Sequence, residues 1–365
     1  MKVAILHDYL NQFGGAERVV KVLLEIFPQA DLYTLLYDKQ KTSGLFDRNI
    51  KKTSFMDIPF IRNHHRMFIP FMPFAAKHLT SPEKYDLVIS STAGYGKGIN
   101  VRGKYHISYC HTPLRYAWEI DYLKNLSASP RPLSNAIAYP IARRLREWDK
   151  RSASRVNLFI ANSTFIADKI KSYYGRDAVV VNPPVNLKIF FPEPTAAKRD
   201  YYLMAGRLLY YKGFDLGIAA FNQLQKPLKI VGQGPELEKL MKMARSQKIE
   251  FITKADDREL RKLYANAKAL LFPQIEDFGL VAAEAQACGT PVIAYERGGI
   301  RDIVINKKTG LFFNEQTPAA IVEAVKDFEN MSFSRSSIAK AAERFSKENF
   351  IREFLEILRS YGLMI

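Results

Sequence analysis

Short apolar runs alternate with longer amphipathic segments along almost the whole chain. In the first half, the apolar runs predict strands at residues 3–7, 32–36, 87–91, 106–110 and 158–162. Between the first two of them, A-E-R-V-V-K-V-L-L-E-I-F at residues 16–27 has apolar positions at helical spacing and predicts an amphipathic helix. This alternation is typical of α/β domains built on a parallel sheet.

A second series of strands and helices begins after residue 200. Its predicted strands are residues 202–205, 228–231, 250–253, 269–272 and 291–294. Between the two series, N-P-P-V-N at residues 182–186 and the F-P-E-P-T that follows cannot continue a helix, so this stretch predicts a hinge. We expect an α/β fold with two Rossmann-like domains, residues 1–183 and 184–345, and a terminal helix within 346–365 that could pack back on the N-terminal domain.

Composition agrees with this organisation. The chain has 365 residues and is 47% hydrophobic, which is ample for two cores. Residues 1–6 run at once into His7 and Asp8 and predict the first strand, so we expect no signal peptide, and the apolar run at 67–76 is too short to span a bilayer. Cys110 and Cys288 lie in unrelated segments and suit reduced thiols rather than a disulfide or metal site. These features favour a cytoplasmic protein.

The net charge is +17, and most of the excess lies in the N-terminal half. Residues 48–79 are the extreme case, with one acid, Asp57, among several bases and phenylalanines. The bases are Arg48, Lys51, Lys52, Arg62, Arg66 and Lys77, and the phenylalanines are Phe55, Phe60, Phe68, Phe71 and Phe74. Bases mixed with exposed aromatics suit an anionic membrane surface, where each base contributes about 1 kcal/mol.

This basic aromatic segment admits two readings. In the first, Lys51, Lys52, Arg62 and Arg66 contact a membrane or a membrane-bound acceptor, and the protein is peripheral on the inner face of the membrane. In the second, the phenylalanines are core residues and the bases form a solvated face. Nucleic acid is not an expected partner, because no helix-turn-helix, zinc-finger or RRM-type motif accompanies the charge.

The richest chemistry lies at residues 273–294, P-Q-I-E-D-F-G-L-V-A-A-E-A-Q-A-C-G-T-P-V-I-A. Glu276 falls on the loop after a predicted strand, and Glu284 falls one turn into a small-residue helix at about 280–288. This is the crevice at the carboxyl ends of parallel strands, where α/β sheets bind ligands. The backbone N–H groups of Gly279, Leu280 and Val281 would point at an anion there.

A carboxylate close to a phosphate is expected where the ligand also carries hydroxyl groups. The sequence therefore predicts a sugar nucleotide as ligand. The alternative is that Glu284 is a solvated helix residue and Glu276 an ordinary loop acid. The A-A-E-A context argues against it, because it places Glu284 among residues that should be buried.

Glycine-rich turns follow several predicted strands. Gly14 and Gly15 open the first helix, and Gly232-Gln233-Gly234 follows a strand of the second series. Arg207 and Lys212 flank another such turn and offer a rigid fork and a mobile point charge to two phosphates. Each turn alone could be only a turn, and none is the full G-x-G-x-x-G fingerprint. Together with the two glutamates they predict a diphosphate site.

Four sequence blocks occur in one order: G-G-A-E-R-V at 14–19, C-H-T-P-L-R-Y-A-W at 110–118, G-R-L-L-Y-Y-K-G at 206–213 and E-x(7)-E at 276–284. They resemble the retaining GT-B glycosyltransferases of the large family that includes many bacterial and archaeal mannosyltransferases. The resemblance covers nearly the whole chain. The second block, with H-D-Y-L at 7–10, is similar to the O-antigen mannosyltransferase branch.

The resemblance implies a GT-B architecture with two domains facing each other across a cleft, and a role for each matching residue. It assigns ribose binding to Glu284 and neutralisation of the diphosphate charge to Arg207 and Lys212. Glu276 would contact the donor sugar and stabilise the transition state. Gly15 would allow close approach of the ligand, and His111 would contact the transferred sugar. The implied reaction is same-face departure and attack with retention of configuration. No D-x-D motif occurs, so we expect neither a metal nor another cofactor.

The resemblance also implies a substrate pair. We expect transfer of a sugar, with mannose from GDP-mannose as first choice, onto a glycan or lipid-linked acceptor in cell-surface polysaccharide synthesis. Two alternatives stay open: a sugar-nucleotide epimerase on the same fold, and a non-catalytic protein that binds nucleotide sugars.

Overall fold

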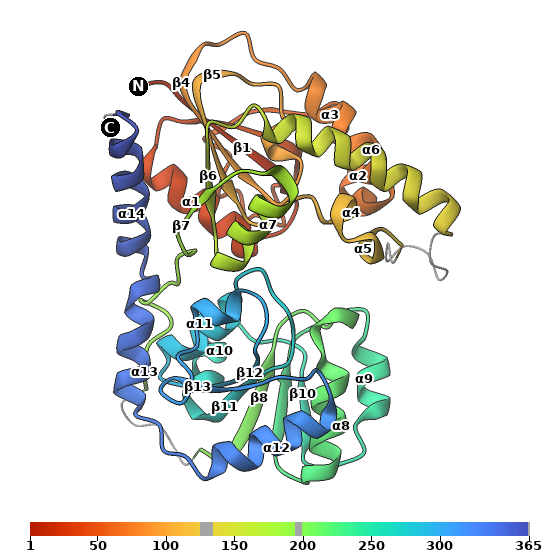
Figure 1. Cartoon of the computed structure of the whole chain (residues 1–365), viewed down its shortest axis with the longest axis vertical. Helices are drawn as coiled ribbons and strands as arrows, with labels where there is room; N and C mark the ends of the chain where they lie inside the picture. The colour runs from red at the N-terminus through yellow and green to blue at the C-terminus, as the bar shows by residue number, and fades with distance from the viewer. Residues whose placement is uncertain (125–133, 194–198, 364–365) are drawn as a thin grey trace. The chain divides into compact units, whose positions relative to one another are not determined.

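The computed structural model describes residues 1–124, 134–193 and 199–363. The chain divides into two compact units (Figure 1). The N-terminal unit consists of Met1–Asn182 and the chain from Ile351 onward, and the C-terminal unit consists of Pro183–Phe350. The division between Asn182 and Pro183 falls inside the Pro-rich stretch.

The N-terminal unit contains a seven-stranded parallel sheet with strand order β3-β2-β1-β4-β5-β6-β7. Its strands are β1 Val3–Leu10, β2 Asp31–Tyr37, β3 Ile50–Thr53, β4 Tyr85–Thr92, β5 Gly103–Cys110, β6 Leu158–Ala161 and β7 Ala178–Val180. The predicted strands of this half are confirmed, and β3 and β7 were not predicted. Both are short and partly exposed: β3 has two exposed lysines in place of the apolar run that marks the inner strands, and β7 has only three residues.

Helices flank this sheet (Figure 1). They are α1 Gly15–Ile26, α2 Pro59–His64, α3 Met72–His78, α4 Arg115–Trp118, α5 Ile120–Lys124, α6 Asn135–Ala153, α7 Thr164–Tyr174 and α14 Lys347–Ser360, with 3₁₀ turns at His65–Phe71 and Gly96–Gly98. The predicted first helix is confirmed, because α1 buries its stripe of Val19, Val20 and Leu23. Most of α14 belongs to the N-terminal unit, where Phe354 and Leu358 are fully buried.

The C-terminal unit contains a six-stranded parallel sheet with order β10-β9-β8-β11-β12-β13. Its strands are β8 Tyr201–Ala205, β9 Leu228–Val231, β10 Ile249–Ile252, β11 Ala267–Phe272, β12 Val292–Tyr295 and β13 Gly310–Phe313. Its helices are α8 Phe214–Leu224, α9 Leu237–Met243, α10 Asp257–Asn266, α11 Leu280–Ala287, α12 Pro318–Glu329 and α13 Arg335–Ala342, with 3₁₀ turns at Tyr210–Lys212, Gly299–Asp302 and Glu343–Phe345. The predicted strands of this half are confirmed, and β13 was not predicted.

Each sheet reverses its strand order beside its first strand. In the N-terminal unit the reversal lies between β1 and β4, and in the C-terminal unit it lies between β8 and β11. Open parallel sheets bind ligands at the carboxyl ends of the strands next to such a reversal. Both units are therefore Rossmann-like, and each has one edge that suits a ligand.

Candidate active site

The turns after β8 and β9 pack tightly against each other at the carboxyl edge of the C-terminal sheet. Leu208 N–H donates to the Gln233 carbonyl oxygen at 2.9 Å, and Glu236 N–H donates to the Leu208 carbonyl oxygen at 3.3 Å. A Cβ atom at Gly232 would collide with the Gly206 carbonyl oxygen, and one at Gly234 would collide with the Leu208 carbonyl oxygen. These glycines are thus required by packing between the two turns.

The predicted phosphate cation and the predicted sugar-binding acid lie together. The Lys212 ammonium, at the end of the 3₁₀ turn before α8, contacts Glu276 Oε1. Gln274 Nε2 donates to the same oxygen at 3.3 Å. The two side chains are only 14% and 21% exposed, so the pair is largely shielded from water. An ammonium group and a carboxylate that can bind hydroxyl groups therefore lie side by side at the edge of this sheet.

A second pair of glycines supports the Glu276 loop, and the sequence analysis did not identify it. Gly299 N–H donates to the Glu276 carbonyl oxygen at 2.8 Å, and Glu276 and Gly298 form a parallel β-bridge. A Cβ atom at Gly298 would crowd the Glu276 backbone, and one at Gly299 would crowd the Asp277 backbone. The E-R-G-G-I sequence after β12 was the available signal, because paired glycines often mark close approach of two backbones.

Glu284 is buried inside the C-terminal unit. It lies on α11 and is 5% exposed, and the Tyr264 hydroxyl donates to its Oε2 at 3.5 Å. Burial, followed by the nearby Glu284 charge, raises the pKa of the Cys288 thiol to about 12. The reading of Glu284 as a solvated helix residue is therefore wrong, and Cys288 stays a neutral thiol.

Helix α11 begins as predicted. Gly279 precedes it with φ +109°, a backbone angle that favours glycine, and Leu280 is its first helical residue. Val281 follows in the first turn, so these residues place their unpaired backbone N–H groups at the positive end of the helix dipole. Gly289, with φ +75°, follows the helix as the predicted terminator.

A cleft of about 710 Å³ opens at this edge. It is lined by the turns after β8, β9 and β10, by α10 and by the start of α11. Arg207 lines it and is exposed, and Val281 and Tyr264 lie on its wall. The segment 253–260, which contributes Lys254 and Asp256, was missed by sequence reasoning because nothing in its composition distinguishes it from a surface loop.

In the N-terminal unit, His111 follows β5 at the carboxyl edge of the sheet. Its backbone N–H donates to the Thr92 carbonyl oxygen at 2.8 Å, and its carbonyl oxygen accepts from Asn162 Nδ2 at 3.0 Å. Its Nε2 lies 2.8 Å from Ser91 Oγ. Gly15 is the first residue of α1, beside the strand reversal, so both predicted residues of this unit lie at the carboxyl edge of its sheet.

The basic aromatic segment 48–79 is divided between core and surface. Phe68 packs on the core, while Phe55, Phe60, Phe71 and Phe74 are 57–60% exposed. The proposal that all the phenylalanines are core residues is therefore wrong.

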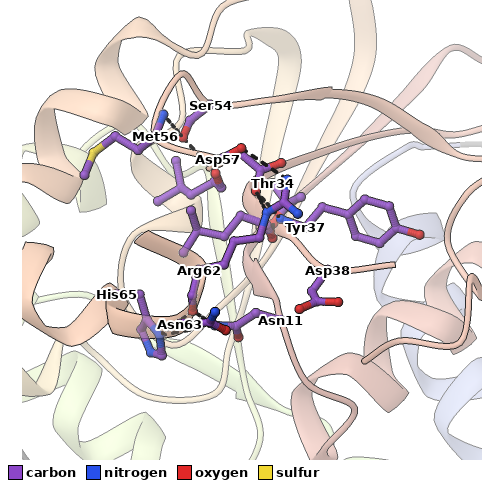
Figure 2. Close-up of polar contacts among 12 residues, drawn as sticks. Asn11, Thr34, Tyr37, Asp38, Ser54, Met56, Asp57, Arg62, Asn63 and His65 are labelled. Carbon is purple, nitrogen blue, oxygen red and sulfur yellow. Dashed lines mark hydrogen bonds and ion pairs between the residues drawn. The ribbon is translucent and has the colours of Figure 1, made fainter. Parts of the chain in front are cut away.

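The four candidate bases also differ. Lys51 and Lys52 lie exposed on β3, with the Lys51 ammonium 3.7 Å from Asp31, and Arg66 is half-buried. Arg62 Nε donates to Asp57 Oδ1 at 2.6 Å, and a second guanidinium nitrogen donates to the Asp57 carbonyl oxygen (Figure 2). Arg62 thus forms an ion pair with Asp57 within this segment.

Two family models match the chain. The model described as glycosyl transferases group 1 matches residues 186–345, and the model described as Glycosyltransferase Family 4 matches residues 13–189. The two matches together span residues 13–345 and both describe glycosyltransferases, and the fold is that of the GT-B glycosyltransferases. Arg207, Lys212, Glu276 and Glu284 lie within the first match, and His111 lies within the second.

A curated relative also carries the name glycosyltransferase, and solved structures share the fold. An uncharacterised glycosyltransferase of Methanocaldococcus jannaschii is 22% identical over 353 residues, which are 95% of this chain and 94% of that protein. Sucrose-phosphate synthase from Thermosynechococcus elongatus has a TM-score of 0.71 at 19% identity and covers 99% of both chains. An Anabaena protein in complex with UDP-glucose has a TM-score of 0.68 at 16% identity, covering 99% of this chain and 100% of that one.

Proposed function

We propose that this glycosyltransferase moves a hexose from a nucleoside diphosphate sugar to a hydroxyl of a glycan or lipid-linked acceptor, with retention of configuration. The observation that carries the proposal is the contact between Lys212 and Glu276 at the sheet edge where α11 begins. A phosphate would find a cation and a helix N-terminus there, and sugar hydroxyls would find a carboxylate.

The arrangement suits departure of a diphosphate. Arg207 on the cleft wall, Lys212 and the first N–H groups of α11 would offset the charge that develops on the leaving group. Glu276 would hold hydroxyls of the transferred sugar and favour positive charge on its ring, and Glu284 would hold the ribose. In this account His111 contacts the transferred sugar. Positioning and charge neutralisation supply the rate enhancement.

The donor we propose is GDP-mannose. Its support is the C-H-T-P-L-R-Y-A-W block, which resembles that of O-antigen mannosyltransferases. The Anabaena neighbour was solved with UDP-glucose, which supports a nucleoside diphosphate sugar as donor and makes UDP-glucose the first competitor.

A donor screen tests this function. Purified protein is incubated with GDP-mannose, UDP-glucose or UDP-galactose, each with and without a glycan acceptor, and free nucleoside diphosphate is measured. We expect acceptor-dependent release of GDP from GDP-mannose. Conversion of a donor sugar without nucleotide release would instead indicate an epimerase, and tight binding without turnover would indicate a binding protein.

We also propose that the N-terminal unit docks on an anionic membrane where its acceptor resides. Exposed phenylalanines, with Met67 55% and Ile58 48% exposed, place several apolar side chains on the surface around α2 and α3. The rings of Phe55 and Phe74 are 5.7 Å apart, so part of this surface is continuous. Lys51, Lys52 and Lys77 supply positive charge next to it. Within the described parts of the chain, no helix combines the length and the apolar character needed to cross a bilayer.

A further inference from the structure

A buried chain of polar contacts in the N-terminal unit links the glycine turn before α1 to His111. Glu17 Oε2 accepts a hydrogen bond from the Gly14 N–H at 2.7 Å, and Glu17 Oε1 lies 4.0 Å from His7 Nε2. His7 Nδ1 donates to the Ser91 carbonyl oxygen at 2.7 Å. The Ser91 hydroxyl lies 2.8 Å from His111 Nε2. Three elements, α1, β1 and β4, thus connect to the end of β5.

The contacts of His7 define its protonation state. A carbonyl oxygen only accepts hydrogen bonds, so Nδ1 carries a proton, and Nε2 faces a carboxylate, which favours a second proton there. Burial alone would lower the pKa of His7, but Glu17, with a smaller effect of Asp8, raises it overall. His7 is 2% and Glu17 3% exposed, so a histidine–carboxylate pair lies inside the unit.

Such a pair is costly to bury unless each ion keeps several partners. Here the partners are backbone groups at the ligand-binding edge: the Gly14 N–H for Glu17 and the Ser91 carbonyl for His7. The pair therefore fixes the backbone at both points. It holds the turn that opens α1 and the strand end from which the Ser91 hydroxyl reaches the His111 ring.

We propose that Ser91, His7 and Glu17 are positioning residues, which hold the His111 imidazole in one orientation and tie it to the glycine turn at Gly14 and Gly15. This inference rests on the proposed function, in which His111 contacts the transferred sugar. A small displacement of such a group can cost up to about a hundredfold in turnover.

The adjacent residue on β4 offers a matched control. Ser90 is fully buried like Ser91, and its hydroxyl lies 2.9 Å from Nε2 of a different histidine, His106 on β5. Burial, with the charges of Arg155 and Lys97, lowers the pKa of His106 to about 3, so this ring is neutral. Successive strand residues point to opposite faces of the sheet, so Ser90→Ala makes the same change on the other face.

The experiment compares Ser91→Ala, His7→Asn and Ser90→Ala in the full-length protein. Asn at position 7 can still donate to the Ser91 carbonyl but carries no charge. The chain has six histidines, so imidazole ¹⁵N and ring-proton signals of ¹⁵N-histidine protein can be resolved and assigned with single His variants. Steady-state kinetics with donor and acceptor, and calorimetry with the nucleoside diphosphate, complete the set.

We expect Ser91→Ala and His7→Asn to shift the His111 signals and to lower kcat by roughly ten- to a hundredfold with unchanged nucleotide affinity. Ser90→Ala should shift only the His106 signals and leave kcat near wild type. Unmoved His111 signals in folded Ser91→Ala would overturn the inference, as would an equal loss of kcat in Ser90→Ala. His111→Ala separates the two proposals. Normal turnover in that variant would contradict the contact between His111 and the sugar, and with it the catalytic part of this inference. Shifted His111 signals in Ser91→Ala would still support the positioning contact between Ser91 and His111.

Discussion

Lys212 and Glu276, separated by 64 positions in the chain, contact each other through ammonium and carboxylate. The two groups were predicted for different parts of one ligand, Lys212 for the diphosphate and Glu276 for the sugar. With the roles proposed above, their contact would place these two parts side by side, as they are in a nucleotide sugar. The pair would then exchange its mutual contact for contacts with the donor. Substitutions at the two positions should therefore have non-additive effects on kcat/KM.

Arg207→Ala should weaken binding of the nucleotide sugar. Arg207 is exposed on the cleft wall, and a bound diphosphate would lose a charge-assisted hydrogen-bond partner. The expected loss is roughly 1.5–3 kcal/mol of binding free energy, measured by calorimetry with GDP and UDP. Arg245→Ala, at an exposed arginine of the same unit outside the cleft, serves as the control. Wild-type affinity in Arg207→Ala would remove this residue from the donor site.

EDTA should leave most of the activity intact. The chain has no D-x-D motif, and we assign charge neutralisation to Arg207, Lys212 and the N-terminus of α11. Initial rates are compared before and after dialysis against EDTA, and again with added Mg²⁺ or Mn²⁺. A complete loss of activity that either ion restores would assign the neutralising role to a metal.

Stability should fall at alkaline pH through His7. Burial lowers the pKa of His7, but Glu17 and Asp8 raise it in the folded protein above the ordinary value of 6.5. The contribution of His7 to the free energy of unfolding is therefore complete below pH 6.5 and is lost as pH rises through the pKa of the folded protein. Glu17 behaves oppositely: its lowered pKa makes a contribution that is present above pH 4.5 and lost as pH falls through the folded value.

Denaturant unfolding, repeated between pH 6 and pH 10, measures the contribution of His7 to the free energy of unfolding. His7→Asn should be less stable than wild type near neutral pH, and the difference should shrink at alkaline pH. His111, reached through the Ser91 hydroxyl, is a further titratable group in this chain of contacts, besides Glu17 and Asp8, so the comparison is repeated in His111→Gln. A stability difference that does not change between pH 6 and pH 10 would show that His7 is not charged in the folded state.

Binding to anionic vesicles should depend on both charge and aromatic side chains. Exposed charges are screened beyond ~10 Å at 0.1 M salt, so co-sedimentation should weaken as salt is added. Lys51/Lys52/Arg62/Arg66→Ser should bind less at low salt, with Lys51 and Lys52 responsible for most of the loss because Arg62 is paired with Asp57. Phe60/Phe71→Ser should reduce binding at every salt concentration.

Phe191→Ser is the matched control for the aromatic variant. Phe191 is a 41% exposed phenylalanine of the C-terminal unit, away from the basic aromatic segment in sequence. If wild type ignores anionic vesicles at low salt, or Phe60/Phe71→Ser sediments like wild type, the segment is only a solvated face.

The sequence predicted the inner strands of both sheets well. Buried parallel strands such as β1 and β11 have continuous apolar runs, which mark them directly. The edge strands β3, β7 and β13 escaped prediction. β3 has two exposed lysines in place of an apolar run, whereas β7 and β13 are short apolar runs, A-V-V and G-L-F-F, that were not identified as strands.

The candidate site was predicted in its residues but not in its contacts. The E-x(7)-E spacing places one acid on a loop and one on a helix. The burial of Glu284 could be anticipated from its alanine neighbours. The Lys212–Glu276 contact and the Gly298–Gly299 support could not, since each joins segments whose approach depends on the order of strands in the sheet. The His7–Glu17 pair could not either, since it depends on how α1 packs against β1.

The two glutamates allow the most direct test of the whole account. Glu284, buried next to Tyr264, would bind the ribose in ground state and transition state alike, so Glu284→Ala should mainly weaken nucleotide affinity. Glu276, beside Lys212, would act on the transferred sugar as charge develops, so Glu276→Ala should mainly lower kcat.

The measurement combines calorimetry with free nucleoside diphosphate and steady-state transfer kinetics for both variants. We predict a large affinity loss and a modest change in kcat for Glu284→Ala, with near-normal nucleotide affinity and a strongly reduced kcat for Glu276→Ala. Equal losses of nucleotide affinity in the two variants, or normal turnover in Glu276→Ala, would contradict the assignment of this site to nucleotide-sugar transfer.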